Sequence, residues 1–364
     1  MDLVIFCHSL MSDWNHGNAH FLRGVVAELL DRGHSVRVWE PLDGWSRANL
    51  VADQGRQAIV DVEQHFPQLR SGTYDLSCFD VGALTAGADV VLVHEWTDPA
   101  VVAAVGRHRR QAGYRLLFHD THHRMVTAPR EMAAFDLQHY DGVLAFGQIL
   151  SGLYRERGVA ERAWTWHEAA DARTFRPLDG VARRADLVWI GNWGDGERAA
   201  ELAEFLIEPV RRLGLRADVY GVRYPDQARA QLDAAGIRYG GWRANHRVPA
   251  AFAAHAVTVH VPRGPYATVL PGIPTIRPFE AMACGIPLVS APWDDAEQLF
   301  RRGTDHLVAT SGAEMTRLLD EVIHDPQLAA SLREQGIATV RERHTCAHRV
   351  DELMAVCAEI GVGP

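Results

Sequence analysis

The stretch from Val257 to Ser290 constrains the fold most, because it reads as a strand, a set of turns, a helix and a second strand. Val257–Val261 is apolar and rich in β-branched residues, as buried strands of parallel sheets are. Six Pro and Gly residues follow and turn the chain repeatedly. Phe279–Cys284 is a good helix former, and the next strand begins at Leu288. This order predicts an α/β fold with parallel strands.

A second strand–helix–strand unit begins the chain. Leu3–Cys7 is a buried strand, Ala19–Leu30 has apolar residues at helical spacing, and Ser35–Trp39 is the next strand. Such a unit requires parallel strands joined by a right-handed crossover. Because 364 residues are too many for one typical core, we expect two domains.

The helix after Thr275 is predicted to bind an anion. Thr275 is suited to cap it, so the first backbone N–H groups, including that of Ile276, and the positive end of the helix dipole face outward. Glu280 lies about one turn further on, where an exposed carboxylate accepts hydrogen bonds from two neighbouring ribose hydroxyls. Phosphate at the helix start and ribose on Glu280 together describe a nucleotide site.

Glu280–Pro287 reads Glu-Ala-Met-Ala-Cys-Gly-Ile-Pro and resembles the donor-site signature of retaining GT-B glycosyltransferases of the group 1/4 type. That signature has an earlier glutamate, which contacts the donor sugar and would fall at Gly272 here. The run Pro271–Glu280 is more similar to the CgeB-like, spore-maturation branch of the superfamily. Leu29–Val38 also resembles part of the GT-B N-terminal domain.

The resemblance implies two Rossmann-like α/β/α domains whose parallel sheets face each other across a cleft. Residues 1–170 would form the acceptor-side domain and residues 171–345 the nucleotide-sugar donor domain, with a crossover at Asp171–Pro177. Val340–Ile360 reads as the last helix, and residues 346–364 would pack back on the first domain. The implied activity is that of a hexosyltransferase-like enzyme, which transfers a sugar from a nucleotide donor, UDP-sugar in our expectation, with retention and without a metal or other cofactor.

The turn Gly191–Trp193 follows a strand and is predicted to bind the donor. In the resembled family an Arg and then a Lys at this place bind the pyrophosphate. Here Asn192 takes the Arg position, and Arg198 lies near the Lys position. Arg198 would bind phosphate oxygens with two nitrogens; the alternative is an ordinary residue on a helix surface.

Every basic residue apart from histidine is Arg, because the chain contains no Lys. Arg263 and Arg277, which flank the proposed nucleotide site, are therefore alternative phosphate ligands. Trp242 lies where the family has its base pocket, and it would either stack on the base or belong to the core.

Histidines follow the strands of the N-terminal half. Arg115–Phe118 leads into His119 and Asp120, and Val90–Val93 leads into His94 and Glu95. Ligands of parallel sheets bind beyond these carboxyl ends. The spacing does not suit a metal, so we expect none. The resemblance makes His119 and Asp120 catalytic candidates, with His119 bonding the transferred sugar or adjusting acceptor protonation; a structural histidine is the alternative. The further acceptor-side candidates are His16, Gly17, Asn18 and His122.

Composition limits the partners. A net charge of −9 argues against nucleic acid. Five scattered cysteines without a C-x-x-C pair suggest reduced thiols and a cytoplasmic protein. Leu3–Cys7 lacks a basic lead, so we interpret it as a strand rather than a signal peptide. No apolar run approaches the roughly 20 residues of a membrane span, and peripheral membrane contact stays open.

The acceptor remains open among a small molecule, a glycan and a protein. Two other functions also remain open on this architecture. One is a nucleotide-sugar epimerase or hydrolase, and the other is a non-catalytic protein that binds a nucleotide or a sugar.

Overall fold

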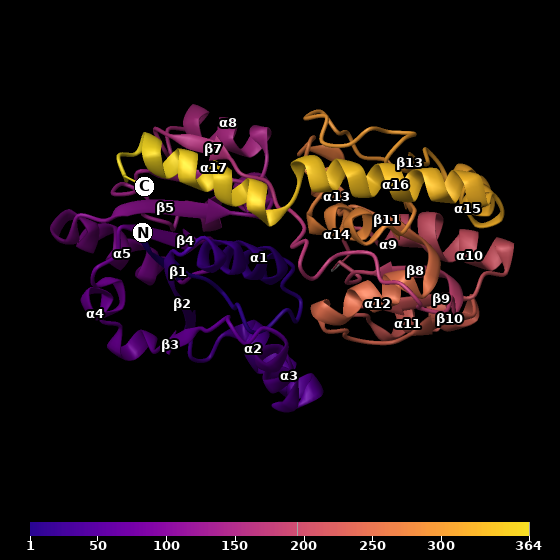
Figure 1. The fold of residues 1–364 in the computed structure, drawn as a ribbon, viewed down its shortest axis with the longest axis horizontal. Helices are drawn as coiled ribbons and strands as arrows, with labels where there is room; N and C mark the ends of the chain where they lie inside the picture. Colours follow the sequence, from indigo (N-terminus) through magenta and orange to yellow (C-terminus); the bar gives the residue numbers. More distant parts are fainter. Residues whose placement is uncertain (195, 364) are drawn as a thin grey trace. The chain divides into compact units, whose positions relative to one another are not determined.

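The computed structural model describes residues 1–194 and 196–363, which form two compact units (Figure 1). The first unit contains Met1–Glu168 together with Cys346–Pro364, and the second contains Ala169–Thr345. The ends of the chain therefore belong to the same unit. Asp195, in the predicted donor-binding loop, lies outside the described residues.

The sheet of the first unit is wholly parallel, with the strand order β3-β2-β1-β4-β5-β6-β7 in the described part of the chain. Its strands are β1 (Asp2–Phe6), β2 (Ser35–Pro41), β3 (Gly72–Tyr74), β4 (Val90–His94), β5 (Arg115–Asp120), β6 (Gly142–Ala145) and β7 (Ala163–Thr165). The order reverses between β1 and β4, so the loops after these two strands diverge. In open parallel sheets this switch point is where ligands bind.

Helices cover both faces of this sheet, and the last of them comes from the far end of the chain. They are α1 (Asn18–Asp31), α2 (Trp45–Gln54), α3 (Gln57–His65), η1 (Leu76–Cys78), α4 (Val81–Thr85), α5 (Pro99–Ala112), α6 (Arg124–Thr127), α7 (Pro129–Met132), α8 (Gln148–Glu156) and α17 (Cys346–Glu359). Helix α17 packs on α1, where Arg32 Nη1 lies 2.6 Å from Asp351 Oδ1. The indole of Trp166 donates to the backbone oxygen of Arg349 over 2.8 Å.

The second unit repeats the architecture with the strand order β10-β9-β8-β11-β12-β13. Its strands are β8 (Ala185–Ile190), β9 (Ala217–Tyr220), β10 (Ile237–Tyr239), β11 (His255–His260), β12 (Leu288–Ser290) and β13 (Leu307–Val308). Its helices are α9 (Ala199–Leu202), η2 (Ala203–Ile207), α10 (Glu208–Leu213), α11 (Asp226–Ala234), η3 (Asn245–Arg247), α12 (Val248–Ala253), α13 (Gly264–Thr268), α14 (Ile276–Cys284), α15 (Gly312–His324) and α16 (Pro326–Arg343). The switch point lies between β8 and β11, and the buried core beneath it includes Trp189, Val257 and Val289.

The strand–helix–strand units predicted at Leu3–Trp39 and Val257–Ser290 are confirmed, because continuous apolar runs define them locally. The single helix expected over Val340–Ile360 is wrong. Helix α16 ends at Arg343, and His344 has an extended φ of −133°. Its carbonyl accepts a hydrogen bond from Ala170 N over 3.1 Å, and this long-range contact separates α16 from α17.

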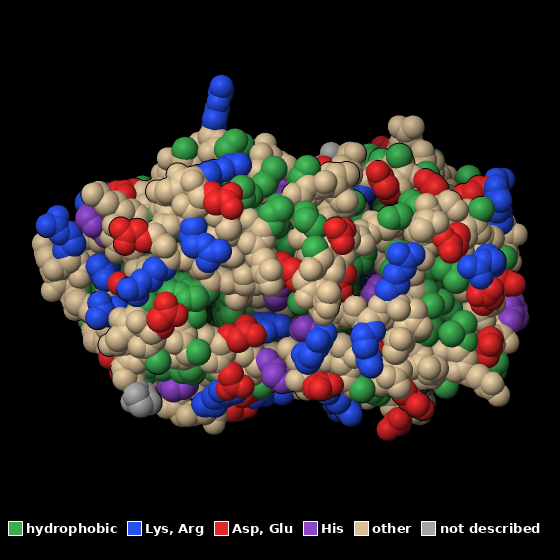
Figure 2. All heavy atoms as spheres, turned by 90° about the horizontal axis from the view of Figure 1, so that it is seen from above, with side chains coloured by type: hydrophobic (Ala, Val, Ile, Leu, Met, Phe, Trp, Pro, Cys, Tyr) green, Lys and Arg blue, Asp and Glu red, His purple; other side chains and the backbone are tan. Residues whose placement is uncertain are grey.

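Charge is mixed on the molecular face drawn in Figure 2, where basic and acidic side chains are interspersed. Within residues 1–194 and 196–363, no helix combines the length and apolar character that crossing a membrane requires.

Candidate functional site

The loop after β8 holds Arg198 against the backbone at the switch point of the second unit. Its Nη1 donates to Val261 O over 2.8 Å, and its Nη2 donates to Asn192 O over 2.6 Å. Burial and then the nearby Arg263 charge lower the pKa of Arg198 to about 10, so the group is still protonated near neutral pH. Nε is buried and makes no hydrogen bond in the structure. Arg198 is therefore a pre-oriented cation rather than a mobile surface residue.

Arg198, Arg263 and Arg277 form one positive group, which we call the arginine cluster. The charges of Arg263 and Arg277 both act to lower the pKa of Arg198. Arg263 pairs with Glu197 over 3.2 Å, and Arg277 pairs with Glu280. Because these two carboxylates balance only part of the charge, the cluster suits an anion.

The start of α14 has an unusual backbone. Thr275 precedes the helix with φ 60° and ψ −177°, a region that is almost restricted to glycine. Its side chain makes no capping hydrogen bond, so the predicted capping role of Thr275 is wrong. The side chain of Ile276 is buried, which leaves its backbone N–H as the group relevant to a ligand. Helix α14 ends as predicted, with Gly285 in the left-handed region at φ 72°.

Glu280 is fully buried, which corrects the expectation of an exposed carboxylate. Its Oε2 pairs with Arg277, and its Oε1 accepts from Asn245 Nδ2 over 3.3 Å. Position 277 is one helical turn before 280, so this pair follows from α14 itself. A ribose would reach the carboxylate only after Arg277 moved away.

Position 272 is Gly instead of the glutamate of the resembled signature, and the side chain of Glu297 occupies the adjacent space. A Cβ added to Gly272 would lie 2.6 Å from Glu297 Cγ and 2.7 Å from its Oε1. Gly272 also has φ +86°, which disfavours any side chain. A carboxylate thus lies beside this position although the chain supplies it from a different loop.

The remaining predicted donor residues have different environments. Trp193 is a core residue whose ring packs near Tyr224, which leaves its backbone as the group relevant to a ligand. The side chain of Asn192 accepts from Val222 N over 3.0 Å and fixes the loop that begins at Gly191. Trp242 is half-buried, which agrees with neither a fully exposed surface nor a closed core.

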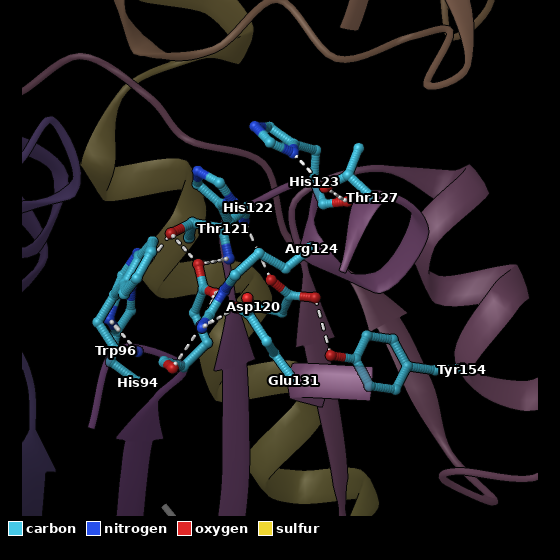
Figure 3. Close-up of polar contacts among 11 residues, drawn as sticks. His94, Trp96, Asp120, Thr121, His122, His123, Arg124, Thr127, Glu131 and Tyr154 are labelled. Carbon is cyan, nitrogen blue, oxygen red and sulfur yellow. Dashed lines mark hydrogen bonds and ion pairs between the residues drawn. The ribbon is translucent and has the colours of Figure 1, made fainter. Parts of the chain in front are cut away.

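In the first unit, Asp120 belongs to a buried polar network at the ends of β4 and β5 (Figure 3). Its oxygens accept from His122 N over 3.0 Å and from the Tyr154 hydroxyl over 2.8 Å. Glu95 pairs with Arg124 over 2.6 Å. Burial raises the pKa of both carboxyl groups. Asp120 is fully buried and both of its oxygens accept hydrogen bonds, and its catalytic role stays a prediction.

Four histidines form a continuous row beside this network. Ring centroids are 5.0 Å apart for His8–His16, 5.9 Å for His16–His94 and 5.2 Å for His94–His119. Burial lowers the pKa of each, in the case of His119 to about 3. The histidine row is therefore uncharged at neutral pH. Within the described residues, no group of three or more potential ligands is arranged to hold a metal.

Hydrogen bonds assign the proton positions on His94. Trp96 N donates to its Nδ1 over 3.4 Å, so the proton lies on Nε2, which donates to Thr121 Oγ1 over 3.0 Å. Both ring nitrogens of His119 are buried without a partner in the structure, as are Nε2 of His16 and the side-chain amide of Asn18.

The structure thus brings predicted residues His16, Asn18 and His119 to the same sheet edge. Gly17 is exposed beside them, and His122 is half-buried at the polar network. Sequence reasoning placed His94 and Glu95 at this edge but missed His8 and Arg124. The position of His8 directly after β1 was the available signal, since it too follows a strand at the switch point.

Residues 198–355 match a family model described as glycosyl transferase-like. The matched segment begins at Arg198 and includes the rest of the arginine cluster, α14 and Glu280. No sequence among the curated proteins matches the chain.

Solved structures match almost the whole chain. HepE of Anabaena, in complex with UDP and glucose, has a TM-score of 0.68 at 17% identity and covers 98% of this chain and 99% of its own. Sucrose-phosphate synthase from Thermosynechococcus elongatus has a TM-score of 0.67 at 13% identity, and the match covers 99% of both chains. T4 phage BGT in complex with UDP-glucose has a TM-score of 0.61 at 12% identity, and the match covers 99% of this chain and 100% of its own. The chain therefore has the two-domain GT-B fold of these glycosyltransferase structures.

Proposed function

We propose that this protein is a glycosyltransferase that takes its sugar from a UDP-sugar. The observation that carries the proposal is the arginine cluster, which lies within the segment that matches the glycosyl transferase-like family. Similar structures contain UDP, UDP-glucose or UDP with glucose, which supports uracil as the base.

The cluster supplies the chemistry that such a transfer needs. When the bond to the sugar breaks, negative charge develops on the departing diphosphate. Arg198, Arg263 and Arg277, together with the N–H groups at the start of α14, would stabilise that charge. Three fixed cations give a reason to propose that no metal is needed, although one T4 phage BGT structure contains UDP and Mn²⁺.

The finer assignments also belong to this proposal. Retention of configuration and membership of the CgeB-like branch rest on the resemblance of Pro271–Pro287. Glu280 would contact the ribose after Arg277 turns toward phosphate, and Trp242 would stack on the base. His119 would act on the acceptor side. Residues 1–170 would form the acceptor domain and residues 171–345 the donor domain. A cytoplasmic location rests on the scattered cysteines.

The test is a screen of nucleotides by thermal shift, followed by donor turnover with and without EDTA. We expect UDP to raise the melting temperature more than uridine does, because only UDP carries the diphosphate. Release of UDP from a UDP-sugar should persist in EDTA. Loss of turnover in EDTA would refute metal independence alone.

Other outcomes would favour the alternatives. Rapid conversion of the donor without any acceptor would indicate an epimerase or hydrolase. Tight UDP binding without turnover of any donor–acceptor pair would indicate a binding protein. Equal shifts by UDP and uridine would contradict the assignment of the arginine cluster.

A further inference from the structure

Two half-exposed tryptophans flank the histidine row of the first unit. Trp45, at the start of α2, is 45% exposed, and Trp96, after β4, is 40% exposed. Tryptophan is highly buried on average and is enriched where one protein surface meets a ligand or partner. Neither ring contributes to the donor chemistry proposed for the second unit.

Ring contacts join Trp45 to the histidine row. Its centroid lies 6.3 Å from that of His8, and the row continues through His16 and His94. Trp14 packs edge-on against Trp45 at 5.2 Å and anchors its own indole on Asp53 Oδ2 over 3.1 Å. Trp45 is thus a supported aromatic surface.

Trp96 meets the other part of the row. Its backbone N–H contacts His94, and its indole lies under the Arg124 guanidinium, 4.0 Å from the ring centroid (Figure 3). The ring also packs edge-on against His122 at 5.1 Å. Because the Arg124 guanidinium packs over the ring and fixes it, Trp96 is a second fixed aromatic surface.

The histidine row and Asn18, two residues after His16, contain buried polar atoms that have no partner in the structure. They belong to the His16 ring, the Asn18 amide and the His119 ring, each of which is more than nine-tenths buried. Buried polar groups normally have hydrogen-bond partners, so these atoms point to a ligand that supplies them. All three side chains are uncharged at neutral pH.

The cations of this edge are already paired with carboxylates. Arg23 pairs with Asp13 over 2.8 Å, and Glu95 pairs with Arg124. Glu40 accepts from Ser9 Oγ and from two backbone N–H groups. One nitrogen of Arg23 is without a partner, but Asp13 compensates its charge. The site therefore offers no surplus positive charge for an anionic ligand.

We propose that this edge of the first unit binds an uncharged sugar of the acceptor, which rests on the proposed transfer function. A sugar has C–H faces that stack on an indole and hydroxyl groups that bond to neutral donors and acceptors. Trp45 is its stacking surface, His16, Asn18 and His119 are hydroxyl partners, and Trp96 is a second stacking surface. The acceptor is thus a glycan or glycoside rather than an anionic small molecule.

A membrane surface is the competing occupant, since Leu42 next to this region is 58% exposed. A bilayer would cover Trp45 and Leu42 alike but would leave the buried atoms of His16, Asn18 and His119 unused. Leu42→Ala removes exposed apolar area without removing a ring, so it is the matched control for Trp45→Ala.

The experiment measures binding of neutral methyl glycosides of glucose, galactose and mannose to the full chain by saturation-transfer NMR with UDP present. We expect at least one glycoside to bind the parent protein. Its affinity should fall about fivefold or more in Trp45→Ala, fall by a smaller factor in Trp45→Phe, and stay unchanged in Leu42→Ala. A methyl glucuronoside should bind at least about fivefold more weakly than its neutral counterpart, because its carboxylate finds no free cation. The UDP-induced thermal shift should be unchanged in every variant.

Several results would overturn the proposal. One is that no neutral glycoside binds. Another is that Trp45→Ala and Leu42→Ala weaken glycoside binding equally, and a third is that the glucuronoside binds as tightly as its neutral counterpart. If both variants also stopped the protein from sedimenting with phosphatidylglycerol vesicles, the surface would be a membrane contact. Loss of sugar binding with an intact UDP shift would refute this inference alone, whereas absence of the UDP shift in the parent protein would refute the proposed function.

Discussion

The first six strands of each unit have the same order, but the switch points of the two units carry different kinds of polar group. In the second unit, Arg198, Arg263 and Arg277 gather positive charge, and carboxylates balance only part of it. In the first unit, the corresponding edge holds the neutral histidine row, and its cations Arg23 and Arg124 are paired with carboxylates. One fold therefore presents a charged site and an uncharged site, and side chains rather than topology decide which.

The difference matches two tasks in the proposed reaction. A diphosphate needs cations that are already in place when its charge develops. A sugar hydroxyl needs neutral donors and acceptors, because a buried unpaired charge beside it would be costly.

Glu280→Ala should destabilise the protein by about 3 kcal/mol, because it leaves the Arg277 charge without its buried partner. Chemical denaturation would measure this loss. Glu321→Ala is the control, since Glu321 makes an exposed pair with Arg317 on α15 and should cost under about 0.5 kcal/mol. A loss for Glu280→Ala as small as that of the control would mean that the pair does not support the fold.

His119→Ala should lower turnover about a hundredfold while UDP affinity stays within a few-fold. His119 ends β5 in the first unit, whereas the arginine cluster belongs to the second. Steady-state kinetics and UDP titration would separate the two effects. His324→Ala, an exposed residue at the end of α15, is the control. Unchanged turnover would make His119 a structural residue.

Arg198→Ala should weaken UDP binding about tenfold or more and uridine binding much less, because a hydrogen bond to a charged group contributes about 1.5–3 kcal/mol. Calorimetric titration of both ligands would measure the ratio. Arg211→Ala, on the exposed side of α10, should change neither. Equal weakening of both ligands would assign the phosphate contact to Arg263 or Arg277.

Much of the fold was predictable because its signals are local. Apolar runs located β1, β4, β5 and β11, and Gly285 located the end of α14. The break between α16 and α17 was not predictable, since it depends on a contact between Ala170 and the distant residues His344 and Thr345.

The site was predictable to a smaller extent. The pattern after β11 indicated Arg277 and Glu280, but the burial of Glu280 depends partly on Asn245, which lies far away in sequence. Likewise, the positions after strands indicated His119, whereas its place in a row of four imidazoles depends on the order of the strands. The placement of Glu297 beside Gly272 has no local signal at all.

Acid should destabilise the protein through the histidine row. A buried histidine whose pKa lies below the ordinary value of about 6.5 binds fewer protons folded than unfolded. Its contribution to the free energy of unfolding is thus complete above about pH 6.5 and decreases as the pH falls toward the pKa of the folded state. For His119, whose pKa is lowered to about 3, the loss should reach about 1 kcal/mol near pH 5.5.

Unfolding free energies measured from about pH 7.5 to 5 would test this pH dependence. Glu95 and Asp120 act in the opposite direction because burial raises their pKa values, so the readout is the difference between parent and variant. His119→Gln should reduce the acid-induced loss, and His260→Gln should do the same for the second unit, where burial lowers the pKa of His260 to about 3. An unchanged slope in His119→Gln would mean that His119 is not held neutral by the fold.

The smallest expected effect concerns the backbone at the start of α14. Thr275 has a conformation that costs a non-glycine residue about 1–3 kcal/mol. Thr275→Gly removes that cost but adds entropy to the unfolded chain, so a net gain of about 1 kcal/mol is expected by denaturation. Thr268→Gly in α13 should instead destabilise, because it removes the hydrogen bond from Thr268 Oγ1 to Gly264 O and adds the entropic cost of glycine in a helix. If Thr275→Gly also destabilised, the threonine would not be strained. If it stabilised the protein while UDP affinity fell, the strain would serve to hold the first N–H groups of α14 toward phosphate, in keeping with a second unit built around charge.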